Sequence, residues 1–240
     1  YMIVIAGESW GRGCWNDQLS DIYHRGLEQY LHDDGHIVVN LSRGGLSLEL
    51  TAQRIKDFLS INTPLFVEDP VRIFVFQTEW HRGKDSLTDS IIPMLRLDQD
   101  VEYWNQYNSE GDDQKIISSF YGVLSHLAIK HAVPIYLIGG CSDTFWLDNF
   151  EKHYPGVKVV CQSLTNLLIN DNHRIDTPVH TIAPPKWLFD KEHAIQTAIL
   201  GNERANLWEE NPQWFYPDGT HANHHGHKKL YEHLQTEGVI

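Results

Sequence analysis

The sequence predicts an α/β protein, arranged as a three-layer α/β/α sandwich around a central, mostly parallel sheet of five strands. Five short apolar runs alternate along the chain with segments whose apolar residues recur at helical spacing. Four of the five runs are almost continuously hydrophobic, which is typical of strands that helices cover on both faces. Because alternating strands and helices imply parallel crossovers, we expect a flavodoxin-like arrangement.

The expected strands are short runs that end at glycine or at polar residues, and they span 2–6, 37–41, 71–76, 135–138 and 157–160. The expected helices lie between and after these strands, and they span 16–32, 46–59, 112–131, 143–153 and about 223–235. In the first of them, the apolar residues follow one helical face: Leu19, Ile22, Tyr23, Leu27, Tyr30 and Leu31.

Two polar and aromatic regions, at about 79–111 and 170–214, interrupt this alternation. Neither is long enough to form a domain, so we interpret both as insertions over the edge of the sheet where the strands end. Ligands usually bind at that edge in open α/β sheets. We therefore expect a single domain over 1–240, with one further helix near 191–200 inside the second insertion.

Composition excludes several classes of partner. The formal net charge is −13, from 19 Lys and Arg against 32 Asp and Glu, which disfavours both nucleic acid and anionic lipid as partners. No apolar run approaches the roughly 20 residues of a membrane span. Three cysteines form no disulfide framework. With no visible signal peptide in a sequence that opens on Tyr1, we favour a cytoplasmic, reducing location.

The first strand stops at Gly7 and presents Ser9 just before a helix. The backbone N–H of Ser9 can point into a site there, and a helix N-terminus favours negative charge. Taken alone, Ser9 fits an ordinary turn or helix-capping serine better than a nucleophile. A serine hydroxyl becomes a good nucleophile only when a base takes its proton, so a partner is needed.

The opposite end of the chain offers that partner in a turn rich in Pro and Gly, 216–221. Asp218 precedes His221 by three residues, so its carboxylate can accept from Nδ1 of the imidazole and leave Nε2 to face a serine. Helix capping is the alternative explanation for this pattern. If the fold brings the two ends together, then Ser9, His221 and Asp218 form a nucleophile, a base and an orienting acid.

Two further segments follow the second and third expected strands. Gly44 and Gly45 allow a tight turn after the second strand, and the N–H of Gly45 could stabilise an oxyanion. At the end of the third strand, Gln77 carries a side-chain amide that could be another oxyanion donor, whereas an ionised Glu79 can only accept. Taken alone, the first segment is better explained as a plain strand-to-helix turn, and the second is also consistent with a polar strand end that has no catalytic role.

Taken together, these four segments resemble the conserved blocks of the SGNH (GDSL-type) hydrolase family. Gly7-Glu8-Ser9 is similar to its Gly-Asp-Ser block, and 40–45 is similar to its second block. The segment 218–221, followed by Asn223 and later by His227, resembles its last block. The resemblance implies a serine esterase, with Gly45 as a backbone donor to the oxyanion.

The third block departs from the commoner pattern of that family, where an asparagine side chain completes the oxyanion hole. The position of that asparagine is Glu79 here, and its charge would repel a developing oxyanion. Gln77 to Glu79 instead resembles the Gln-Gly-Glu of the sialate O-acetylesterase-like branch, which implies Gln77 as the donor. Glu79 would then orient other groups, and the aromatic neighbours Trp10 and Trp80 would line the site.

The function we predict is hydrolysis of carboxylic esters, on a small-molecule substrate or on O-acetyl groups of a carbohydrate. Such a mechanism uses no metal and no organic cofactor. One alternative is a glycan-binding module on the same fold that lacks catalysis, suggested by Glu79 and the aromatic insertions. The other is a metal-dependent enzyme, because His221 and His225 have an i, i+4 spacing within a cluster of histidines.

Overall fold

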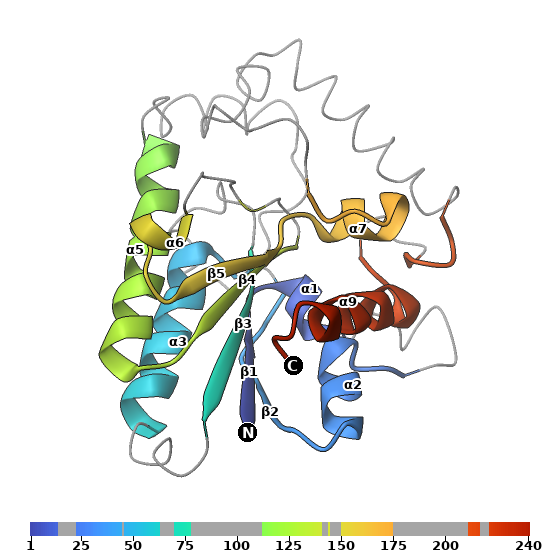
Figure 1. The fold of residues 1–240 in the computed structure, drawn as a ribbon, viewed down its shortest axis with the longest axis horizontal. Coiled ribbons are helices and arrows are strands. Elements are labelled where there is room, and N and C mark those ends of the chain that lie inside the picture. The colour runs from blue at the N-terminus through green and yellow to red at the C-terminus, as the bar shows by residue number, and fades with distance from the viewer. Residues whose placement is uncertain are drawn as a thin grey trace.

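The computed structural model describes residues 1–13, 23–44, 46–62, 70–77, 112–140, 144, 150–174, 211–216 and 221–240. A single sheet of five parallel strands lies between two layers of helices (Figure 1). Its strands are β1 (Met2–Ala6), β2 (Ile37–Asn40), β3 (Val71–Gln77), β4 (Ile135–Gly139) and β5 (Val157–Cys161). The predicted α/β/α sandwich is confirmed, and every predicted strand ends within one residue of its observed end.

The strand order is β2-β1-β3-β4-β5, the flavodoxin-like order. The chain runs from β1 outward to β2 and then crosses back to β3 on the other side of β1. In such sheets the crevice for a ligand opens where the direction of winding reverses, outside the carboxyl ends of the two central strands. Here that point lies beyond the ends of β1 and β3, next to Gly7 and Gln77.

The helices divide between the two faces of the sheet (Figure 1). Against one face pack α3 (Leu48–Asn62), α5 (Asp112–His131) and α6 (Phe150–His153), around a core that includes Val4 and Val75. Against the other pack α1 (Ser9–Arg12), α2 (Leu27–Asp33), α7 (Leu164–Asn170) and α9 (His224–Thr236), around a core that includes Ile5 and Phe76. Successive strand residues thus point into opposite cores, as their period of two requires.

The prediction of a helix over 16–32 was wrong at 23–26, which are not helical, and was confirmed over 27–32, which belong to α2. Residues 16–22 lie outside the described residues. Gly26 explains the difference. It has a φ of 60°, and a side-chain carbon added there would lie 2.9–3.0 Å from Gly13 and from the ring of His227. Tyr23, predicted on the apolar helix face, is instead 65% exposed.

Other helices agree more closely with their predictions. The helix over 112–131 has the predicted bounds, while α3 starts and ends two or three residues later than expected. The last helix, α9, starts one residue after Asn223, whose side chain caps it. The sequence pattern missed the seven-residue α7, which Ser163 caps by accepting from the N–H of Asn166.

The two predicted insertions, apart from 170–174 and 211–214, lie outside the described residues, as does the helix expected near 191–200. The same holds for most of the helix expected over 143–153, of which the structure describes α6 and Thr144. Over the ranges that are described, no helix combines the length and the apolar character needed to cross a bilayer.

Candidate active site

The turn between β1 and α1 brings Ser9 to the carboxyl edge of the sheet. Gly7 adopts a φ of 137°, and its Cα lies so close to β3 that an added Cβ would be 2.5 Å from the carbonyl oxygen of Phe76. Only glycine fits this close approach. Ser9 follows two residues after Gly7 as the first residue of α1, and it is buried beyond the end of β1.

Glu8 is completely buried beside Ser9, and both of its carboxylate oxygens are occupied. One oxygen accepts the backbone N–H of Trp10 at 3.0 Å, so Glu8 caps α1. The other accepts the Ser9 hydroxyl. The sequence gives no sign of this role, because Glu8 stands out there only as the residue in place of the aspartate of a Gly-Asp-Ser block.

His221 lies directly against Ser9, although 212 residues separate them in the sequence. Its Nε2 is 2.9 Å from the Ser9 Oγ, which is hydrogen-bonding distance. The predicted meeting of the two chain ends is thus present in the structure. The Ser9 hydroxyl has two potential acceptors, the imidazole of His221 and the carboxylate of Glu8.

Backbone pairing holds His221 in place. Phe215 and Ala222 form an antiparallel bridge, and Tyr216 donates its N–H to the carbonyl of His221 at 2.9 Å. These bonds lie on both sides of residues 217–220 in the sequence. The position of the imidazole is therefore determined by a short paired segment rather than by helix α9 alone.

Asn223 joins this paired segment to the start of α9. Its side-chain oxygen accepts the N–H of Gly226 at 3.0 Å, and its N–H donates to the carbonyl of Trp214 at 2.8 Å. Its side-chain NH₂ lies 3.1 Å from the carbonyl of Gln213. One buried asparagine thus fixes both the helix start and the preceding residues that carry His221.

Trp10, predicted to line the site, lies close to the proposed base. Its indole ring is 6.2 Å from the ring of His221, measured between centroids. Trp10 is also part of the core beneath, with 5% of its surface exposed. The side chain therefore borders His221 and supports it from the apolar side.

The segment after β2 is tied to the Ser9 turn. Asn40 donates to the carbonyl of Gly11 at 3.1 Å, and its side-chain oxygen accepts the N–H of Ser42 at 2.9 Å. Arg43 donates its N–H to the carbonyl of Gly7 at 3.2 Å. The second block thus lies beside the first, as the sequence motifs imply.

Gln77 ends β3 and is buried. Its side-chain oxygen accepts the hydroxyl of Tyr121, on α5, at 2.6 Å. With the amide oxygen bound to Tyr121, the NH₂ group of Gln77 lies on the side away from that hydroxyl. Tyr121 gave no sequence signal for this role, because an aromatic residue in a long amphipathic helix is indistinguishable from a core residue.

The remaining predicted site residues are Asp218, Gly45, Glu79 and Trp80, and all four lie outside the described residues. Their roles stay predictions. His221 precedes α9, as expected, whereas His225 is exposed on that helix. The i, i+4 pair of histidines is therefore not presented on one helix face.

No protein-family model matches the sequence, and no curated protein matches it. Several solved structures align with almost the whole chain at low identity. The psychrotrophic esterase EstA from Pseudoalteromonas sp., inhibited by monoethylphosphonate, is 9% identical, with 100% of this chain and 99% of that chain covered and a TM-score of 0.43. A lipase/acylhydrolase from Enterococcus faecalis is 14% identical, with 98% and 94% of the two chains covered and a TM-score of 0.40, and TesA is 12% identical, with 98% and 97% covered and a TM-score of 0.42. At such identities and TM-scores, the function must be argued from the site itself.

Proposed function

We propose that this protein is a serine hydrolase of carboxylic esters, in which Ser9 is the nucleophile and His221 the general base. The observation that carries this proposal is the 2.9 Å distance between the Ser9 Oγ and Nε2 of His221. A serine alone is a weak nucleophile, and a base within hydrogen-bonding reach is what activates it. The pair lies at the carboxyl edge of β1, where open α/β sheets bind ligands.

The reaction follows from these positions. The Ser9 hydroxyl turns from Glu8 toward His221, its proton passes to Nε2, and Oγ forms a bond to the acyl carbon. When the tetrahedral intermediate collapses, the ester C–O bond breaks and the imidazolium gives its proton to the leaving alcohol. A water molecule then repeats the sequence on the acyl-enzyme and releases the acid.

Three donors and one acid complete the proposed site. The backbone N–H groups of Ser9 and Gly45 and the side-chain amide of Gln77 would bind the oxyanion. Asp218, three residues before His221, would accept the Nδ1–H and stabilise the imidazolium. This arrangement is that of an SGNH-type hydrolase. O-acetyl groups on a carbohydrate are the substrates we propose, because the third block resembles the sialate O-acetylesterase-like branch.

The proposal is tested with a fluorophosphonate probe, which labels serines that an adjacent base activates. We expect covalent labelling on the peptide that contains Ser9, and loss of label in His221→Gln. Ser125→Ala is the matched control, because Ser125 donates to the carbonyl of Pro155 and is not part of the site. An unlabelled Ser9 in a folded protein that binds acetylated glycans would instead indicate a binding module.

Gln77 gives a second prediction about the same site. Gln77→Ala should lower kcat by about 10²–10³-fold, the usual cost of losing one oxyanion donor, with little change in KM. Tyr121→Phe removes only the hydroxyl that orients the amide, so we expect a smaller loss of kcat, about tenfold. Steady-state kinetics on p-nitrophenyl acetate measures both effects.

Tyr154→Phe is the control for Tyr121→Phe, because Tyr154 packs against the Tyr121 ring at 5.4 Å on the same face of the sheet. It should leave both kcat and KM as they are. If Gln77→Ala keeps the kcat of the unmodified chain, Gln77 is not a donor to the oxyanion.

A further inference from the structure

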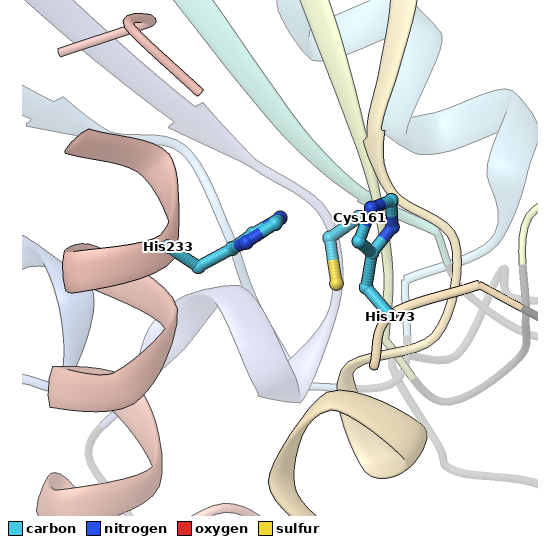
Figure 2. A group of neighbouring side chains, drawn as sticks. All are labelled: Cys161, His173 and His233. Carbon is cyan, nitrogen blue, oxygen red and sulfur yellow. The ribbon is translucent and has the colours of Figure 1, made fainter. Parts of the chain in front are cut away.

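Three side chains that the proposed hydrolase does not use converge on the face of the sheet that α9 covers (Figure 2). Cys161 is the last residue of β5, His173 follows α7 by three residues, and His233 lies on α9. One ligand atom from each lies within 4.8 Å of the other two. Among the residues that the structure describes, this is the one group of three His, Cys, Asp or Glu residues that meets so closely.

The group is accessible from one side. Cys161 is fully buried in the core under α9, whereas both histidines are half-buried. Figure 2 shows the two imidazoles reaching toward the thiol from opposite sides. A small cation could therefore enter past the rings and reach the sulfur, which is the most enclosed of the three atoms.

His233 is already oriented as a ligand would be. Its Nε2 lies 2.8 Å from the carbonyl oxygen of Val160, and because a carbonyl can only accept, Nε2 must carry the proton. When Nδ1 carries no proton, its lone pair is available to a cation. A histidine that donates its other N–H to a backbone carbonyl is the usual arrangement in metal sites, where that bond fixes the tautomer.

His173 stands with its ring 4.7 Å from that of His233, between centroids, at 45°. Its Nδ1 accepts the backbone N–H of Gln162 at 3.2 Å. To ligate through Nε2, the ring must move its proton to Nδ1 and exchange the Gln162 contact for the cation.

We propose that Cys161, His173 and His233 bind one Zn²⁺ or a similar borderline-soft divalent cation. One thiolate and two imidazoles are the donor set that Zn²⁺ prefers, and carboxylate-preferring cations such as Mg²⁺ and Ca²⁺ do not match it. Binding releases the thiol proton of Cys161 to solvent. Three protein ligands leave the fourth tetrahedral position to a water molecule on the open side.

A bound cation would cross-link three segments of the chain. It links the end of β5, the segment after α7 and the last turn of α9. Because α9 begins three residues after His221, the bound cation would also fix the helix that follows the proposed base. This inference concerns stability and metal binding, and it does not depend on whether Ser9 is a nucleophile.

The test uses the full chain after removal of metal with a chelator. Titration with Co²⁺ should give one equivalent bound and a sulfur-to-cobalt charge-transfer absorption, the signature of a thiolate ligand. Zn²⁺ at about 100 times its dissociation constant should raise Tm by about 5–10 °C. Cys161→Ala should abolish the charge-transfer band, and His173→Ala or His233→Ala should weaken binding by more than about 100-fold.

His225→Ala is the matched control, because His225 is an exposed histidine on the same helix. It should bind Co²⁺ as the unmodified chain does. The proposal is overturned if Co²⁺ gives no charge-transfer band, if the band persists in Cys161→Ala, or if His225→Ala loses binding as His233→Ala does. His173→Ala provides the comparison if Cys161→Ala does not fold, since circular dichroism identifies folded variants.

Discussion

Ser9→Ala is expected to lower the kcat of ester hydrolysis by about 10⁴–10⁶-fold while the fold remains intact. The substitution removes the hydroxyl oxygen that lies 2.9 Å from Nε2 of His221 and would attack the acyl carbon. What remains is the weak catalysis that oxyanion donors and substrate binding supply to water. Hydrolysis of p-nitrophenyl acetate measures kcat, and circular dichroism with a thermal scan reports the fold.

The fold should survive because other contacts than those of the Ser9 hydroxyl hold the turn between β1 and α1. Glu8 still caps α1 through the N–H of Trp10, and Gly7 still packs on β3. Ser125→Ala serves as the control, with kcat expected at the value of the unmodified chain. More than about 1% of that activity in Ser9→Ala would assign the nucleophile to another residue.

The sheet could be predicted almost completely from the sequence, and the reason is physical. Strands covered on both faces must be apolar at every position, so runs such as Ile3–Ala6 and Ile73–Phe76 stand out from everything else in the chain. Their parallel direction followed from the alternation with helices, because parallel strands need crossovers. The strand ends were within one residue because each apolar run is closely followed by glycine or polar residues.

Helix starts were less predictable, because they depend on tertiary contacts that the spacing of apolar residues does not reveal. The spacing of Leu19, Ile22 and Tyr23 continues the apolar face of α2, yet Gly26 interrupts the helix to pack against His227, which is 201 residues away. Short α7 was missed for a related reason. Seven residues carry too little periodicity, and only the cap at Ser163 marks the start.

The meeting of Ser9 and His221 was predicted because turn chemistry and topology both point to one edge of the sheet. The acceptor role of Glu8 was not predicted, and neither was the contact of Tyr121 with Gln77, because each depends on a distance between side chains. The cluster of Cys161, His173 and His233 also has no sequence spacing of its own. It forms only because α9 packs across the end of β5.

His227 leads to the second large effect, on stability in acid. The ring is buried against Phe76 and Gly26, and its Nδ1 has no hydrogen-bond partner in the described part of the chain. Burial first, and then His24, His221 and His224 around it, lower the pKa of His227 from 6.5 to about 3. The folded protein therefore keeps this ring neutral at pH values where the unfolded chain protonates it.

The sign of the effect follows from that difference. Between pH 6.5 and pH 3 the unfolded chain binds the extra proton, so the free energy of unfolding falls as the pH is lowered through this range. The loss attributable to His227 is on the order of 4–5 kcal/mol over the whole range, and about 2–3 kcal/mol by pH 4.5. Urea unfolding at a series of pH values measures it.

His227→Leu keeps the side chain large and apolar but removes the titrating ring. We expect this variant to lose about 2–3 kcal/mol less than the unmodified chain between pH 7 and pH 4.5. A smaller acid sensitivity should persist, because burial also lowers the pKa of His24 and of His224. His32→Leu, on the exposed side of α2, should retain the full pH dependence. Equal slopes for His227→Leu and the unmodified chain would mean that His227 takes up its proton in the folded state. The acid sensitivity would then have to come from other groups.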